Sequence, residues 1–224
     1  ADDPSAPDEP RAFLPIAAAY GFAQRIRAGS DVEESWSALQ RLAADERSPV
    51  RLGAIDALVQ LATREGFADE LVERTEVWLS DPERELCYGS TASALDVLAD
   101  GQVLARLKNM EPLTALLTRV MDTVVDAPRS AQRSDGRRRV FRSLGPTLAA
   151  MVAAMRGAQS GADWFASECE RAKDPELRAA LSAALQRMAA LSNAPPRAVI
   201  DGLRSALEKS QKPRGDAARV RPGD

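Results

Sequence analysis

Hydrophobic residues recur every three or four positions along most of the chain, which is the spacing of one face of an α-helix. The clearest segment is 175–191, whose apolar stripe consists of Leu177, Leu181, Leu185, Met188 and Leu191. Its charged residues fall on other faces of the same helix. We therefore expect the stripe to pack against a neighbouring helix.

The same spacing predicts about ten helices in roughly five antiparallel pairs. Their expected spans are 12–28, 32–45, 49–65, 67–79, 82–100, 103–125, 137–156, 162–172, 175–191 and 196–209. The expected N-terminal caps are Asp31 (in a capping box with Glu34), Ser48, Asp81 and Asp174. The glycines expected at C-terminal ends are Gly66, Gly101 and Gly157.

One phrase recurs at the start of several of these helices: a small polar residue, a proline, then apolar and basic residues that lead to Ala-Leu. It is clear in the segments 48–58 and 174–185, and looser from Asp81-Pro82 and Ala127-Pro128. Repetition with a period of tens of residues indicates stacked structural units.

These phrases resemble HEAT repeats, in which the second helix of each pair starts with Asp-x-x-Val-Arg and continues through small and apolar positions. The resemblance covers residues 31–191. It is poor at 127–149, where Gly145-Pro146 interrupts the pattern and 127–136 look inserted. The resemblance implies an all-α fold, a right-handed α-solenoid of about five antiparallel helix pairs, and it leaves the subfamily open.

Composition divides the chain into three parts. Residues 1–10 are acidic and rich in proline, and residues 209–224 are basic and rich in proline and glycine, so we expect both tails to be disordered. Residues 11–208 show no internal boundary and are expected to form a single solenoid domain. Ala and Leu dominate its apolar residues, which favours closely packed helices.

The chain has no histidine, which removes the commonest general base and the commonest metal ligand. Its two cysteines, Cys87 and Cys169, lack the number and spacing of a four-thiolate zinc site. In a linear solenoid they would lie about two repeats apart, too far for a disulfide. We expect both to be reduced and buried, and we expect no cofactor.

The net charge of −3 gives no general attraction to nucleic acid or to an anionic membrane, so a protein partner is expected and nucleic acid is not. No apolar run is long enough to cross a bilayer. The chain begins at Ala1, which fits a trimmed methionine, a boundary within a longer chain, or removal of a signal peptide. A cytoplasmic location is favoured, an exported one stays open, and the oligomeric state is undetermined.

Arg51, Arg142 and Arg178 occupy the same position in their repeats. In the family that the chain resembles, this arginine usually pairs with a carboxylate of the adjacent repeat, which implies a structural ladder that fixes the stacking. A row of ligand-binding arginines on the concave face is the alternative.

The most basic segment coincides with the apparent insertion, and its arginines are the candidate partner-binding residues: Arg129, Arg133, Arg137, Arg138, Arg139 and Arg142. Such a run is either a solvated face or a site for an acidic peptide, a phosphorylated segment or a nucleic acid backbone. Insertions at repeat junctions are common positions for binding sites.

These observations predict a non-catalytic scaffold or adaptor that binds another protein through its concave surface or through segment 127–142. A second hypothesis is a DNA-binding protein similar to the HEAT-like alkylpurine glycosylases, with Trp78 and Trp164 beside a carboxylate. A third is a maturation factor similar to chromophore lyases, although Cys87 falls at a core position equivalent to Val50.

The apolar stripe of 175–191 generates a first prediction. Leu181→Asp places an unpaired charge in a helix–helix seam and should destabilise the fold by about 3–5 kcal/mol. Thermal melting of the variant measures this loss. Unchanged melting would mean that the stripe does not face a neighbour.

Overall fold

The computed structural model of the protein describes residues 10–81, 83–155 and 159–210, and it is all-α over these residues. The helices are α1 (Pro10–Ala28), α2 (Val32–Ala44), α3 (Ser48–Ala62), α4 (Phe67–Leu79), α5 (Arg84–Leu98), α6 (Gly101–Leu104), α7 (Glu111–Val125), α8 (Asp135–Ala154), α9 (Gln159–Arg171), α10 (Pro175–Ala190) and α11 (Arg197–Lys209). The all-α prediction is confirmed. None of the described helices is both long and apolar enough to cross a membrane. The two tails fall almost entirely outside the described residues.

One expected helix span is wrong. The span 103–125 divides, because Asp100 caps the short helix α6 at its start and the next helix, α7, begins at Glu111 with Pro112 in its first turn. Helix α8 continues through Gly145-Pro146, as the span 137–156 predicts, although the repeat pattern is interrupted there. Gly145 is buried against α10, where a β-carbon would lie 3.6 Å from the carbonyl oxygen of Ala180.

The expected N-terminal caps are confirmed only at Asp174, whose carboxylate accepts from the backbone N–H of Leu177 at 2.9 Å. Asp31 adopts a left-handed conformation with φ 47° and pairs with Arg25 instead of capping α2. Arg47 precedes α3, so Ser48 is the first helical residue, and Glu83 takes the place expected for Asp81.

The expected glycine ends are also different. Gly66, in a left-handed conformation with φ 85°, lies directly before α4, and Gly101 begins α6. Gly157 lies outside the described residues.

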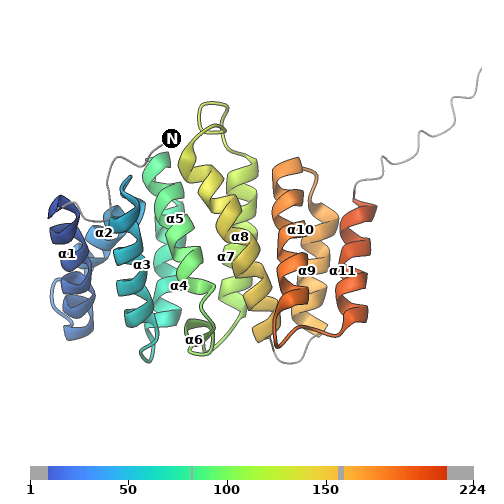
Figure 1. Ribbon diagram of the computed structural model, residues 1–224, viewed down its shortest axis with the longest axis horizontal. Helices are drawn as coiled ribbons and strands as arrows, with labels where there is room; N and C mark the ends of the chain where they lie inside the picture. The colour runs from blue at the N-terminus through green and yellow to red at the C-terminus, as the bar shows by residue number, and fades with distance from the viewer. Residues whose placement is uncertain (1–9, 82, 156–158, 211–224) are drawn as a thin grey trace, which may run out of the picture.

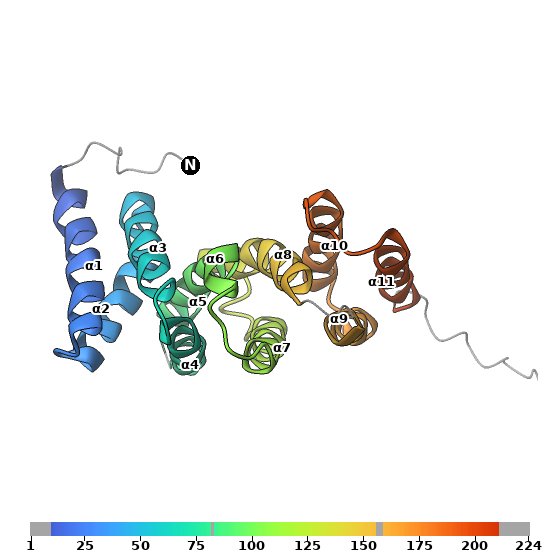
Figure 2. The ribbon, with the colours of Figure 1, turned by 90° about the horizontal axis from the view of Figure 1, so that it is seen from below.

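The helices follow one another along the long axis of the molecule, and most stand roughly across it (Figure 1). Seen along the helices, α3, α5, α8 and α10 form one layer, while α4, α7 and α9 lie on the other side (Figure 2). Helix α2 joins the latter group through contacts with α4. We call α2, α4, α7 and α9 the first-helix layer and α3, α5, α8 and α10 the second-helix layer. Helix α1 packs on α2 and α3 at one end, and α11 packs on α9 and α10 at the other.

Helix α5 is the centre of the core, since it packs against α2, α3, α4 and α8. Every residue from Cys87 to Leu95 is buried, including the small polar residues Ser90, Thr91 and Ser93. Small side chains allow the helices to approach closely. A β-carbon on Gly89 would lie 2.9 Å from Cβ and 3.1 Å from Cα of Ala44 in α2.

The expected stripe of α10 is confirmed as a packing face. Leu181 and Met188 are fully buried, and Leu177 and Leu185 are nearly so. This face packs on α8, with which α10 makes its most extensive contact.

Each helix pair is closed by a side chain of its second helix that donates to a carbonyl at the end of the first helix. Arg51 Nη1 donates to the carbonyl oxygens of Asp45 and Glu46, at 2.8 and 2.5 Å, just beyond α2. Cys87 Sγ donates to Leu79, the last residue of α4, at 3.2 Å.

The two remaining pairs use the same contact. Arg137 Nε donates to the carbonyl of Val124 near the end of α7, at 2.8 Å. Arg178 Nη1 donates to Ala172, just after α9, at 3.3 Å. These donors satisfy carbonyl groups that have no partner within their own helices.

The arginine ladder therefore differs from the expected one. Among the described residues, Arg51 and Arg178 bind backbone carbonyls and form no ion pair with a carboxylate, and Arg178 also donates to Leu207 in α11. Arg142 is exposed and lies 3.9 Å from Asp135 of its own helix. The buried arginine that reaches the next pair is Arg137, which bonds Glu176 of α10.

A ladder of ion pairs does exist, but it joins neighbouring members of the first-helix layer. Arg74 of α4 pairs with Glu33 of α2. Arg119 of α7 pairs with Glu76 of α4 at 3.1 Å, and Arg171 of α9 pairs with Asp122 of α7 at 2.6 Å. In each step the carboxylate lies on the earlier helix and the arginine on the later one.

The close approach of α2 and α5 gives a second prediction. Gly89→Ala should destabilise the protein by about 1–2 kcal/mol, because the added methyl group overlaps backbone and β-carbon atoms of Ala44. Gly202→Ala in α11 is the matched control: nothing lies within 4 Å of its new β-carbon, so a gain of up to about 1 kcal/mol is expected. Urea unfolding measures both changes, and a loss of stability in the control would contradict this account.

Candidate binding groove

The structure separates the six arginines of the basic segment. Arg129 and Arg133 are exposed in the loop between α7 and α8, and Arg138 is exposed on α8. Arg137 is buried and stacks its guanidinium 4.7 Å from the centre of the Phe141 ring. Only Arg139 and Arg142 face a groove, and there they meet Arg51 of α3.

The groove crosses the second-helix layer and consists of two adjoining hollows. The first has a volume of about 560 Å³ and is lined by Arg41, Ala44, Asp45, Glu46, Arg51, Glu83, Glu85, Leu86, Gly89, Asp135, Gly136 and Arg139. The second has a volume of about 280 Å³ and is lined by Ser48, Arg51, Leu52, Ile55, Asp96, Arg139, Arg142 and Ser143. Arg51 and Arg139 line both hollows, so the two hollows adjoin at these side chains.

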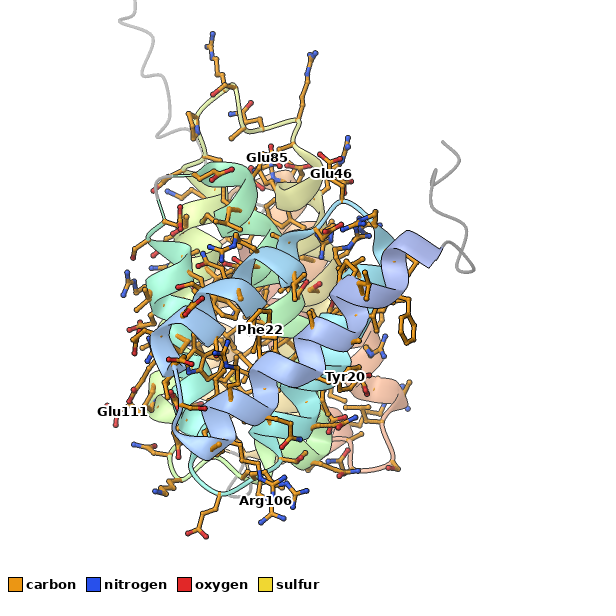
Figure 3. All side chains as sticks on the ribbon, turned by 90° about the vertical axis from the view of Figure 1, so that its left-hand side faces the viewer. Tyr20, Phe22, Glu46, Glu85, Arg106 and Glu111 are labelled. Atoms are coloured by element: carbon orange, nitrogen blue, oxygen red, sulfur yellow. The ribbon has the colours of Figure 1, made fainter. Side chains whose placement is uncertain are left out.

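The two hollows carry opposite charge. Five carboxylates and three arginines line the first, which we call the acidic hollow. Figure 3 shows two of these carboxylates, Glu46 and Glu85, near each other at one end of the molecule. Three arginines and one carboxylate line the second, which we call the basic hollow.

Glycine makes room at the floor of the acidic hollow, where α5 and α8 meet. A β-carbon on Gly136 would lie 3.0 Å from Cβ of Tyr88 and 3.3 Å from the backbone nitrogen of Gly89. Because neither glycine carries a side chain, the backbones of α5 and α8 come close together here. The hollow above them is lined by charged residues.

Arg139 spans the boundary between the hollows. Its Nη2 donates to Ser93 Oγ at 2.9 Å, and Ser93 Oγ donates in turn to the carbonyl of Ala43 at 2.6 Å. Burial and the nearby charge of Arg51 lower the pKa of Arg139 to about 10. The guanidinium thus stays charged at neutral pH, but in a place where a cation is poorly solvated.

Asp96 is the carboxylate of the basic hollow. Loss of water around it raises its pKa, while a hydrogen bond from Ser143 and the charges of Arg139 and Arg142 act in the opposite direction. Its negative charge therefore only partly offsets the three arginines.

The tryptophans and cysteines do not contribute to the groove. Trp36 and Trp78 are buried and pack edge to face at 6.2 Å, and Trp164 is half-buried and donates to Thr118 Oγ1 at 3.2 Å. Cys87 and Cys169 are both buried, as expected, and burial raises the pKa of Cys169 to about 12. Within the described residues, no three side chains of the metal-ligating types are grouped to hold a metal ion.

No known family model matches the sequence, and no curated protein matches it. The fold and the groove define an all-α protein of paired helices in two layers.

Sequence reasoning found part of the groove. Arg139, Arg142 and Ser143 have the i, i+3 and i+4 spacing of one helix face, which was the available signal. It missed the carboxylates Glu46 and Glu85 as parts of the groove, because only the fold brings the loop before α3 and the start of α5 beside α8.

The raised pKa of Asp96 gives a third prediction, with pH as the variable. Because the folded state binds this proton more tightly than the unfolded chain, ionised Asp96 lowers stability as pH rises above 3.8, the ordinary pKa of the side chain. Asp96→Asn should be more stable than the wild type at neutral pH, and the gain should vanish below pH 3.8. Denaturant unfolding at both pH values tests this, and an equal gain at both would contradict a titration effect.

Proposed function

We propose that this chain is a HEAT-like right-handed α-solenoid that acts as a non-catalytic scaffold and binds a segment of another protein in the groove of the second-helix layer. The repeated closure of each pair by a side chain at the start of its second helix supports the repeat architecture. Stacked helix pairs create extended binding surfaces.

The observation that carries the proposal is that several charged groups in the groove stay unpaired among the described residues, whereas those along the first-helix layer pair between successive helices. In the first-helix layer, carboxylates and arginines of successive helices pair with one another, as in Glu76–Arg119 and Asp122–Arg171. In the groove, Arg41, Glu46 and Glu85 form no ion pair with any described residue. Charged groups that fold stability does not use are available to a partner.

The groove also has an apolar wall. Leu52 of α3 is 61% exposed and lies beside Ile55 in the basic hollow. An exposed leucine next to charged groups is typical of protein-binding surfaces, which bury apolar side chains within a polar rim.

The DNA-binding hypothesis receives less support. The acidic hollow places five carboxylates on the path of a phosphate backbone, which they would repel. The candidate Trp78 is buried in the core, where no base can stack on it.

Site-specific crosslinking tests this proposal. A photoreactive amino acid at Leu52, in the groove, should crosslink the full chain to one defined protein in its native cells. The same amino acid at Val77 of α4, which is 64% exposed, is the matched control and should give no such product. Nuclease treatment of the product separates a protein partner from nucleic acid. Equal crosslinking at both positions, or none at Leu52, would reject the groove as the binding site.

A further inference from the structure

The arrangement of charge in the groove also indicates what kind of segment it binds, an inference that rests on the proposed function. The acidic and basic hollows adjoin at Arg51 and Arg139, so an extended segment laid across these two side chains reaches both hollows. Opposite ends of that segment must therefore meet opposite charges.

The basic hollow suits a carboxylate followed or preceded by an apolar side chain. Arg139 makes one side-chain hydrogen bond within the described residues, to Ser93, and its remaining donors border the groove. Arg142 is 71% exposed at its side chain, and the ion pair it makes among the described residues is a long one, 3.9 Å from Asp135. A carboxylate between the two guanidiniums would accept charge-assisted hydrogen bonds from both, and Leu52 would lie beside it.

The acidic hollow suits basic side chains. Glu46, Glu83 and Glu85 form no ion pair with a described residue, and they surround a volume of about 560 Å³. Like charges that lie close together repel one another, and a bound lysine or arginine relieves that repulsion.

A carboxylate fits the basic hollow better than a phosphoryl group does. Asp96 lines the basic hollow, and Asp135 at its border lies 3.9 Å from Arg142, so two carboxylates oppose three arginines and the local excess is one positive charge. A single negative charge balances it, whereas a dianion would face those two aspartates.

We propose that the groove binds an extended partner segment that carries both signs of charge. An acidic residue contacts Arg139 and Arg142, an adjacent apolar residue packs on Leu52, and basic residues lie over Glu46 and Glu85. The segment thus has a fixed direction in the groove, because reversal would place like charges together.

Selection from a library of random peptides on the immobilised full chain tests this inference. Enriched peptides should combine an acidic–apolar pair with basic residues on one side of it. Enrichment of peptides with a single sign of charge, tighter binding after phosphoserine replaces the acidic residue, or no enrichment would overturn the inference.

Charge-reversed variants then assign the contacts. Arg142→Glu and Glu46→Lys should each weaken binding of a selected peptide about fivefold. Arg197→Glu is the matched control: its side chain is 95% exposed on α11, away from the groove, so binding should stay unchanged. A peptide in which lysine replaces the acidic residue should bind the Arg142→Glu protein more tightly than it binds the wild-type protein. If all three variants bind the selected peptide equally, the inference is wrong.

The two failures are distinguishable. If crosslinking at Leu52 identifies a partner but selected peptides carry one sign of charge, the groove is a binding site and only its assigned chemistry fails. If crosslinking at Leu52 also gives no product, the proposed function fails as well.

Discussion

The carbonyl groups at or just beyond the ends of α2, α4, α7 and α9 have no partner further along a helix, and in each pair the start of the second helix supplies one. A guanidinium does so at Arg51, Arg137 and Arg178, and a thiol does so at Cys87. A positive group also suits the negative end of a helix dipole, so the arginines add an electrostatic gain. This contact fixes where the second helix begins relative to the end of the first. It thus acts together with the shared apolar core to set the register of the two helices in each pair.

Neighbouring helices are joined by different kinds of contact in the two layers. The first-helix layer joins its neighbours through ion pairs, and its charges are consumed in the fold. In the second-helix layer, α5 and α8 meet closely at Gly89 and Gly136, and α8 and α10 are joined by the buried Arg137, which bonds Glu176. Glu85, Arg139 and Arg142 of this layer lie at the surface of the groove. The candidate binding site thus depends on which charged residues the packing of each layer leaves unpaired.

The helical class, most helix spans and the packing face of α10 could be predicted from the sequence, because apolar spacing reports directly on burial. The caps could not: Asp31 has a suitable side chain, but its pairing with Arg25 and its left-handed backbone prevent capping. The sequence pattern correctly marked Arg51 and Arg178 as equivalent positions, but it predicted a carboxylate partner for each. The structure has backbone carbonyls there, which leave no signal in the sequence. In α8 the buried arginine is Arg137 and not Arg142, because the loop before α8 changes the register of the phrase. The groove could not be predicted from the sequence, because Arg51 of α3 and Arg139 of α8 come together only in the folded structure.

The two layers should also respond differently to dissolved salt. The Arg119–Glu76 and Arg171–Asp122 ion pairs of the first-helix layer are about half exposed, and dissolved salt weakens exposed pairs more than buried ones. In the second-helix layer, the glycine contact between α5 and α8 has no charge to screen, and the Arg137–Glu176 ion pair involves a buried arginine. Higher ionic strength should therefore weaken the contacts of the first-helix layer more than those of the second-helix layer.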